Sequence, residues 1–471
     1  MTRDALVLKY QSEATQRRET EPPQSTVKLG PGETTHKPIL GRLRIYSGQS
    51  SNRPLNRRVT LTSPTRSILQ LTSFLLVLPF AQTAACDDWP RFRGPFLDGI
   101  SRETYWPNFS DSDQPTNLWT QNVGTGISGV VTSESLLFTI GNVDDADVVR
   151  CFESDSGKTV WSFSYACPLD PNEFEGGPTS TPTIDGGSLY TLSRLGQVHC
   201  FEKHTGKLRW SVNAAEDNDI RVPAWGFAGS PLVVGDMLLL NVGEAGLALN
   251  VHTGKLLWKS TDKDAGYSSM VPLKQQGKSA IVFGSARSYV CVEIESGKEL
   301  WRQRWLTTFG CNAADPIVSG DSVFLSSGYN RGSALLKNTD GGPDVIWKSK
   351  ELQNQLSTSI LMEGFLYGIH GDVDAGTQLR CMELTSGNVA WTEESFHPSA
   401  MAAAGNRLII ITSDGELVIA DASPEKFQVI SQHKVIEGKC WTSPTLSDGL
   451  LYVRTVDGDL TCLDLSQSQA N

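Results

Sequence analysis

Residues 198–210 read VHCFEKHTGKLRW, and this stretch decides the fold. A short apolar run leads into a turn at Thr205-Gly206-Lys207, and a second run ends in Trp210. Repeats of this size indicate a solenoid, a propeller or another array. Similar stretches, the last of them looser, occur at 149–161, 289–301, 379–391 and 246–258.

Each copy of this motif belongs to a longer repeat, in which a Ser/Pro-rich strand start, a Gly/Asp turn and an apolar strand come first. Four short strands per repeat of about 40–50 residues are typical of a propeller blade. The sequence therefore predicts an all-β, eight-bladed β-propeller with four-stranded blades. The first strands begin near Gly129, Thr179, Gly229, Ser269, Ala314, Thr358, Ser399 and Thr442. The third strands centre on Cys151, Cys200, Ala248, Cys291, Leu336, Cys381, Ile419 and Cys462.

The two ends of the repeat array complement each other. The eighth repeat ends at Leu465 after its third strand, and an isolated Trp-containing strand at 117–120 precedes the first repeat. An N-terminal strand that completes the last blade would pair an otherwise exposed edge. We therefore expect a propeller over 117–465 that is closed by this N-terminal outer strand, with Trp119 beside Cys462.

The recurring positions have structural explanations. Glycine in the tight turn allows φ > 0, and the small Cys or Ala of the third strand leaves room for an indole. The Trp on the outer strand is expected to cover the junction between blades. This blade motif comprises Gly157, Trp161, Gly206, Trp210, Gly254, Trp258, Gly297, Trp301, Gly387 and Trp391.

The motif resembles the tryptophan-docking repeat of the quinoprotein (PQQ-dependent) alcohol dehydrogenase propellers. The shared features are the small residue, Ser/Thr-Gly-Lys, and a Trp after the turn. The resemblance implies an eight-bladed propeller but not catalysis, since relatives include BamB, a non-enzymatic scaffold lipoprotein of outer-membrane β-barrel assembly. Further segments similar to exported PQQ-like repeat proteins are 88–95 (DWPRFRGP), 98–101, 223–226, 312–316 and 328–332.

The N-terminal part differs from the repeats in composition. Residues 1–65 are polar and lack periodicity, which predicts a disordered extension or a mis-assigned start of translation. Residues 66–85 predict a signal peptide, because Arg66 precedes an apolar stretch at 68–80 and small residues follow it. Cys86 would then be either an unpaired residue or a lipid-modified one. Residues 86–116 form a lead-in segment, and 466–471 a C-terminal tail.

Charge argues against one class of partner. Residues 1–85 hold 12 of the 41 basic and 5 of the 52 acidic residues, so the remainder has 29 against 47 and a formal net charge of −18. Nucleic-acid binding requires a basic patch or stripe, and we expect no nucleic-acid partner. The signal sequence predicts an exported protein, periplasmic or associated with the cell envelope, with membrane contact only through a lipid at Cys86.

Cofactor chemistry lacks a clear set of residues. The resemblance implies a vicinal disulfide over the quinone, but the sequence has no adjacent cysteines, and no CxxC or paired-His spacing predicts a metal site. The acidic loops at Asp144 and Asp372 could hold Ca²⁺ or be solvated turns. We therefore expect no catalytic residue and no metal site. PQQ with Ca²⁺ belongs to the alternative function.

The longest links between repeats, 162–178 and 211–228, carry residues suited to a ligand. These links and the turns between second and third strands should share one end of the propeller, opposite the Gly turns. An aromatic residue and an arginine at a channel mouth suit a ligand or a peptide, although Trp225 could instead plug the channel. The candidates for this ligand face are Arg221, Trp225, Asn312, Asp315, Arg331 and Trp441.

The sequence as a whole favours a binding or scaffolding module at the cell envelope. Its partner would be an envelope protein or a small ligand on the face formed by the inter-blade loops. The alternative is a PQQ-dependent alcohol or sugar oxidoreductase, because the same fold carries both kinds of function.

Overall fold

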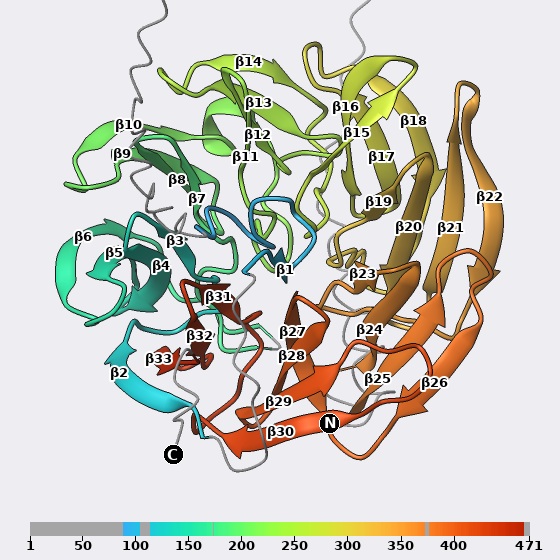
Figure 1. Cartoon of the computed structure of the whole chain (residues 1–471). Helices are drawn as coiled ribbons and strands as arrows, with labels where there is room; N and C mark the ends of the chain where they lie inside the picture. Colours follow the sequence, from blue (N-terminus) through green and yellow to red (C-terminus); the bar gives the residue numbers. More distant parts are fainter. Residues whose placement is uncertain (1–87, 104–113, 173, 373–375, 466–471) are drawn as a thin grey trace, which may run out of the picture. The chain divides into compact units, whose positions relative to one another are not determined.

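Eight sheets surround a common centre in the computed structural model, which describes residues 88–103, 114–172, 174–372 and 376–465. Figure 1 shows their circular arrangement. The regular elements of the described residues are strands, apart from one short 3-10 helix, η1 (Glu216–Asn218). The predicted eight-bladed propeller is confirmed.

Blades 1 to 6 each use four consecutive antiparallel strands, from the inner strand at the centre to the outer strand at the rim. Blade 1 consists of β3 (Val131–Ser133), β4 (Leu136–Val143), β5 (Ala146–Glu153) and β6 (Thr159–Ala166). Blade 2 consists of β7 (Thr183–Asp185), β8 (Ser188–Leu192), β9 (Gln197–Glu202) and β10 (Leu208–Asn213), and blade 3 of β11 (Leu232–Val234), β12 (Met237–Leu240), β13 (Leu247–Asn250) and β14 (Leu256–Lys259).

The same order continues through the second half of the ring. Blade 4 consists of β15 (Val271–Gln275), β16 (Lys278–Gly284), β17 (Ser288–Glu293) and β18 (Glu299–Arg304), and blade 5 of β19 (Ile317–Ser319), β20 (Ser322–Ser327), β21 (Gly332–Thr339) and β22 (Gly342–Ser349). Blade 6 consists of β23 (Ile360–Met362), β24 (Phe365–Asp372), β25 (Gly376–Glu383) and β26 (Val389–Glu393), and blade 7 of β27 (Pro398–Ala404), β28 (Arg407–Thr412), β29 (Glu416–Asp421) and β30 (Val429–Lys434).

Blade 8 joins the two ends of the array. It consists of β31 (Thr445–Ser447), β32 (Leu450–Arg454), β33 (Asp459–Asp464) and, as its outer strand, β2 (Thr116–Asn122). β2 pairs antiparallel with β33, and Trp119 lies opposite Cys462. The predicted closure by an N-terminal strand is confirmed.

The lead-in segment crosses the centre of the ring before it reaches β2 (Figure 1). Its backbone accepts hydrogen bonds from inner strands, with Trp89 O bound to Thr132 N and Pro90 O to Ile184 N. It then forms β1 (Ile100–Ser101), which pairs in parallel with β27. The sequence did not predict this strand, because two residues are too short to show any alternation.

The tryptophans of the outer strands join neighbouring blades. Gly206 has φ +68°, and a Cβ at this glycine would lie 2.5 Å from the Trp161 ring of the preceding blade. Each indole N–H also reaches a hydrogen-bond acceptor in the next blade, so the ring is both packed and oriented. The acceptors are Ser154 O for Trp119, Lys203 O for Trp161, Val251 O for Trp210, Ile294 O for Trp258, Asn338 Oδ1 for Trp301, Leu384 O for Trp347 and Ser423 O for Trp391.

Two blades depart from the predicted repeat. In blade 5 the residue opposite the outer-strand Trp347 is Leu335, whereas the predicted Leu336 is one residue too late. The reason is that this blade replaces the Ser/Thr-Gly-Lys turn by a two-residue connection between β21 and β22. In blade 7 the outer strand has Ser431 where other blades have Trp, and it lies opposite Ile419.

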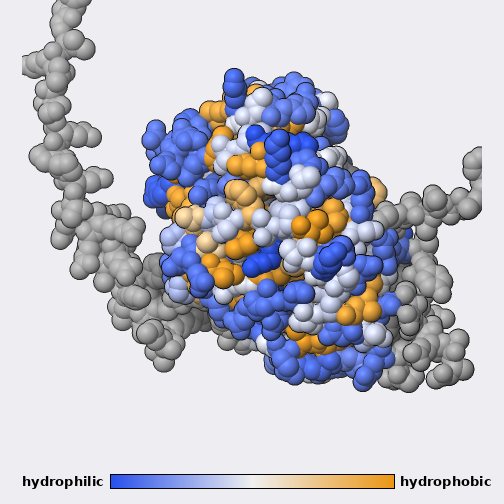
Figure 2. Space-filling model, turned by 90° about the vertical axis from the view of Figure 1, so that its left-hand side faces the viewer, coloured by the Kyte–Doolittle hydropathy of each residue, from blue (hydrophilic) through white to orange (hydrophobic). Residues whose placement is uncertain are grey.

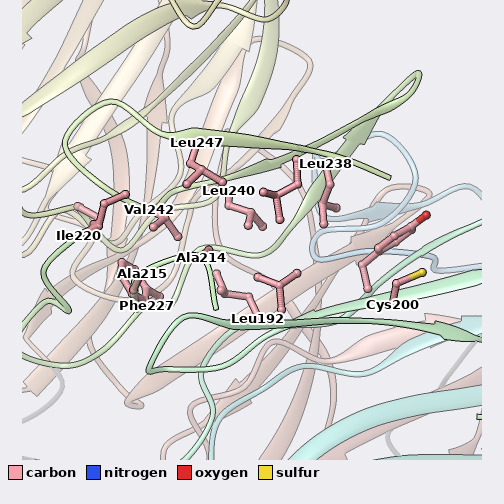
Figure 3. Close-up of a cluster of buried hydrophobic side chains, with 14 of the residues drawn as sticks. Leu192, Cys200, Ala214, Ala215, Ile220, Phe227, Leu238, Leu240, Val242 and Leu247 are labelled. Carbon is pink, nitrogen blue, oxygen red and sulfur yellow. The ribbon is translucent and has the colours of Figure 1, made fainter. Parts of the chain in front are cut away.

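The core lies between adjacent sheets. Figure 3 shows the contact between blades 2 and 3, where Leu192 and Cys200 face Leu238 and Leu240. Outer strands are half-exposed and carry several exposed apolar side chains. On the side of the molecule in Figure 2, apolar residues form small separate patches among hydrophilic ones. The exposed apolar side chains of outer strands include Val160, Leu208, Leu256, Leu257, Val345 and Ile346.

Candidate functional site

A cavity of about 230 Å³ opens at the end of the propeller where the inter-blade links lie. We call this the link end, and the end with the Gly turns the turn end. The link at 167–169 contacts the turn between β4 and β5, because Leu169 N donates to Asp145 Oδ1 at 2.9 Å. The links and these turns therefore share one end, as the sequence predicted. The lead-in residues Trp89, Phe92 and Arg93 form the other boundary of the cavity.

The cavity wall is built from the residues that stand two places before the inner strands. In five successive blades, the backbone N–H at this position donates to the side-chain oxygen of its equivalent in the next blade. We call these side chains the inner-strand ring. The bonds are Gly129 N to Thr181 Oγ1 (2.9 Å), Thr181 N to Ser230 Oγ (3.1 Å), Ser230 N to Ser269 Oγ (3.1 Å), Ser269 N to Asp315 Oδ1 (2.7 Å) and Asp315 N to Thr358 Oγ1 (2.8 Å).

Asp315 is the carboxylate of this ring, and the residue is 6 % exposed. Burial raises the pKa of Asp315 to about 6, while the charge of Arg93 and the hydrogen bond from Ser269 act in the opposite direction. Desolvation of the carboxylate thus exceeds its stabilisation by neighbours. The ionised carboxylate is therefore less stable here than in water, and a further cation or hydrogen-bond donor would stabilise it.

Arg93 anchors the lead-in beneath the ring. Its guanidinium donates to four backbone carbonyl oxygens, at 3.0 to 3.3 Å, including those of Thr358 and Ser359 just before β23. Burial lowers the pKa of Arg93 from its ordinary value, and the nearby Asp315 and Asp98 act in the opposite direction. Arginine remains charged under such conditions. Arg93 therefore ties the lead-in to blade 6 and places a cation below Asp315.

Aromatic rings form an arc at the mouth. Trp225 packs edge-to-face against Tyr267 (centroids 5.7 Å apart) and Phe309 (6.1 Å), and Phe309 packs in the same way against Tyr329 (5.2 Å). The indole N–H of Trp225 donates to Asn172 O at 2.9 Å, so the ring is held by the preceding link. Trp225 lies in the cavity wall. Trp225 therefore borders the cavity at its mouth, and the lead-in segment lies in the centre of the ring (Figure 1).

A second group of residues lies across the seam between the first and last blades. Lys439 pairs with Glu175 at 3.0 Å, and its ammonium lies 3.5 Å from the ring centroid of Trp441. Trp441 and Phe174 both line the cavity. The ion pair and the cation–π contact therefore connect the two sides of the cavity mouth where the last blade meets the first.

Three of the six predicted ligand-face residues line the cavity, namely Trp225, Asp315 and Trp441. The other three do not. Arg221 is 68 % exposed at the surface and pairs with Asp264 at 3.2 Å. Asn312 is fully buried and donates to Ser285 O, and the guanidinium of Arg331 lies over the buried Trp305 ring. Both of these are structural, because links fold back over the blades in a way that the sequence does not show.

Sequence reasoning missed Arg93, Trp89, Tyr267 and Tyr329 as cavity residues. The stretch at 88–95 did carry a signal, since Trp, Arg and Phe are concentrated just before the first repeat. Its position in the centre of the ring depends on pairing with inner strands of distant blades. No local pattern reports such a pairing.

Within the described residues, neither a cluster of metal ligands nor a thiol of low pKa lies at the cavity. Within the described ranges, no group of three or more His, Cys, Asp or Glu residues could hold a metal. The eight cysteines described are free and buried, and burial raises the pKa of the Cys311 thiol at the cavity wall to about 11. Of the helical segments that the structure describes, none is long and apolar enough to cross a membrane. Cys86 and part of the acidic loop that follows Asp372 lie outside the described residues.

The comparisons with known proteins agree with this architecture. A sequence model of the family described as outer membrane protein assembly factor BamB matches residues 144–393, just over half of the chain. The chain is 24 % identical over 382 residues to outer membrane protein assembly factor BamB of Escherichia coli K12, covering 75 % of this chain and 89 % of that protein. BamB of Burkholderia pseudomallei is also 24 % identical, over 328 residues, with 65 % and 76 % covered.

Solved structures share the fold at low sequence identity. BamB from Moraxella catarrhalis has a TM-score of 0.56 and 16 % identity, and the match covers 76 % of this chain and 99 % of that one. A europium-containing methanol dehydrogenase has a TM-score of 0.59 and 12 % identity, with 80 % and 89 % covered. At such identity these likenesses show the propeller fold alone.

Proposed function

Because the chain belongs to the family of outer membrane protein assembly factor BamB, we propose that it is an exported propeller that binds or scaffolds other proteins at the cell envelope. The family match carries this proposal, since it spans most of blades 1 to 6. The matched relatives are named for outer membrane protein assembly. By this family relation, the partner is an envelope protein.

The link end is the surface that we assign to the partner. It combines the two longest links with an aromatic mouth, and aromatic residues are enriched at protein interfaces. The turn end instead repeats one short turn in several blades, with an exposed Lys158 or Lys207. A specific partner is better recognised where the blades differ from one another than where they repeat.

A matched pair of charge reversals tests this assignment. Arg221 and Lys207 are both exposed. Arg221 lies in the link after blade 2, at the link end, whereas Lys207 lies in the turn between β9 and β10 of the same blade, at the turn end. Arg221→Glu should weaken capture of an outer membrane assembly protein from envelope extracts, while Lys207→Glu should leave it unchanged. Equal capture by both variants and the unaltered chain would place the partner elsewhere.

Export to the periplasm, with or without a lipid on Cys86, is part of the same proposal. It rests on the predicted signal sequence at 66–85 and on the family relation. Mass spectrometry of the mature N-terminus checks both points. A chain that begins at Cys86 and carries a diacylglycerol supports anchoring, and an unprocessed N-terminus in the cytoplasm argues against export.

A PQQ-dependent oxidoreductase is not supported by the donor set of the cavity. Ca²⁺ takes six to eight oxygen ligands, usually with several carboxylates, whereas Asp315 is the carboxylate among the cavity-lining residues. The residues present therefore do not fit a PQQ–Ca²⁺ pair. Purification with added PQQ and Ca²⁺, followed by dye-linked alcohol oxidation, tests this point directly.

A further inference from the structure

Asp315 is where the inner-strand ring departs from its own pattern. The equivalent residues in neighbouring blades are Thr181, Ser230, Ser269 and Thr358. A hydroxyl is sufficient to accept the backbone N–H of the preceding blade, as all four of these residues do. A carboxylate at this position is therefore not needed for this hydrogen bond, and it adds a buried negative charge that is expensive to desolvate, beside the buried cation of Arg93.

One oxygen of this carboxylate, Oδ1, takes part in the hydrogen bonds of the inner-strand ring. Oδ1 accepts the hydrogen bond from Ser269 N at 2.7 Å, as a hydroxyl would. Oδ2 accepts no hydrogen bond from the part of the chain that the structure describes, and the residue lines the cavity. The guanidinium of Arg93 donates instead to four backbone carbonyl oxygens. A ligand in the cavity can thus reach a carboxylate oxygen that the protein leaves unused.

The walls above Asp315 suit a cation. Trp225, Tyr267, Tyr329 and Trp441 all line the cavity, and faces of such rings attract ammonium and guanidinium groups. One ammonium already lies against this wall, since Lys439 Nζ is 3.5 Å from the ring centroid of Trp441. Apolar ring surface also covers the methylene stem that a cationic side chain carries.

Size and charge narrow the ligand class. The cavity of about 230 Å³ is smaller than the roughly 300–1,000 Å³ of sites for drug-sized ligands. It therefore suits a group of a few heavy atoms. The chain beyond residue 85 has a formal net charge of −18 from 29 basic and 47 acidic residues, so its long-range field attracts cations.

We propose that this cavity binds an ammonium group on a short apolar stem, with Asp315 as its counter-ion and the aromatic mouth around the stem. A free alkylamine and the lysine side chain of a protein both present this chemistry. The site is additional to the proposed scaffolding role and does not depend on it.

Binding should depend on pH in a defined direction. Burial raises the pKa of Asp315 to about 6, so the counter-ion is lost as the pH falls from 7.5 to 5. The charged and titratable groups that interact with Asp315 are Arg93 of the lead-in, which also interacts with Asp98, and Tyr289 of β17. The hydroxyl of Tyr289 donates to Ala314 O or Ser326 O, and burial raises its pKa well above its usual value. Asp315 is therefore the group that titrates in this range.

Calorimetric titration of the full chain with butylammonium tests the site, and n-butanol supplies the same stem without the charge. Butylammonium should bind at pH 7.5 and at least about tenfold more weakly at pH 5, while n-butanol should bind at least about tenfold more weakly than butylammonium. Asp315→Asn should cause a loss of similar size. Asp315→Ser is a second variant, because serine fills the equivalent position in blades 3 and 4.

The matched control is Asp321→Asn, which removes the same charge from an exposed turn of the same blade at the turn end. It should bind butylammonium as the unaltered chain does. Equal binding of butylammonium and n-butanol, equal binding by Asp315→Asn, or no butylammonium binding at millimolar concentration would each overturn the proposal.

The two sources of the ammonium group are distinguished with a peptide, acetyl-Gly-Lys-Gly-amide. Asp315-dependent binding of both butylammonium and the peptide supports a site open to lysine side chains, and binding of butylammonium alone supports a free amine. Capture of the envelope partner is measured separately with Arg221→Glu. Failure of the cavity proposal therefore leaves a different signature from failure of the scaffolding proposal.

Discussion

At the scale of single residues, the turn glycines serve two purposes at once. Gly206 has φ +68°, a region that L-residues other than glycine rarely adopt. The same glycine also leaves space for the indole of Trp161, which belongs to the preceding blade. The turn glycine and the tryptophan that packs on it thus belong to different repeats, and each blade is held in place by its neighbour.

Two alanine substitutions in blade 2 separate these purposes. Gly206→Ala places a Cβ 2.5 Å from the Trp161 ring, whereas Gly186 has φ +54° with no atom within 4 Å of its Cβ position. We expect Gly186→Ala to lower the free energy of unfolding by about 1–2 kcal/mol through backbone strain alone. Gly206→Ala should lower it by about 1–3 kcal/mol more, because the indole must move. Urea unfolding of both variants measures the difference, and equal losses would contradict the docking role.

At the scale of elements, the outer strand β2 closes the propeller, and we call this strand the clasp. It pairs with β33 from Thr116 to Asn122 and covers an edge that would otherwise be exposed. Trp119 is 8 % exposed and packs against Tyr452 and Phe152. The clasp therefore joins blade 8 to blade 1 by hydrogen bonds and by a buried aromatic group.

Deletion of residues 116–121 should lower the melting temperature by about 10 °C, since a buried Trp and one ladder of hydrogen bonds are lost. Trp119→Ala keeps the strand and should produce only part of this shift. Differential scanning calorimetry compares the two variants. A deletion with an unchanged melting curve would show that the clasp does not contribute to stability.

At the scale of the whole molecule, one buried and one half-buried histidine make the stability of the propeller sensitive to acid. Burial lowers the pKa of His199 in blade 2 and of His370 in blade 6 to about 4. His199 is stacked among Tyr165, Phe163 and Phe201, where an imidazolium could not be solvated. Both groups are neutral in the folded chain at a pH where they would be protonated in the unfolded chain.

The depressed folded pKa defines the sign of the effect. The contribution of His199 to stability is present above pH 6.5 and is lost as the pH falls towards 4, up to about 3 kcal/mol. His199→Leu should therefore reduce the fall in the free energy of unfolding over this range. Asp315 contributes in the opposite direction, so the difference between variant and unaltered chain is the quantity to measure.

The control for this prediction is His252→Leu, at an exposed turn position of blade 3. It should follow the acid profile of the unaltered chain. Identical profiles for His199→Leu and the unaltered chain would contradict the assignment to His199.

The sequence predicted the blades better than the cavity. In five repeats the turn Gly and the Trp recur at the same spacing, so the repeats could be aligned with one another. The prediction was wrong by one residue at Leu336, where the local turn differs. It was also incomplete for the ligand face, because Asn312 and Arg331 stand in distinctive segments yet serve to hold links and strands in place.

The sequence by itself determined the eight repeats, their four strands and the clasp at Trp119, because turns, alternating apolar residues and a missing last strand are local signals. Only the tertiary structure decided which of the predicted ligand-face residues share the cavity, and that the lead-in residue Arg93 joins them. Arg93, Trp225, Asp315 and Trp441 come from the lead-in and from links of different blades. Ring closure brings them together, and a separation of this kind along the chain leaves no periodic pattern for a sequence to show.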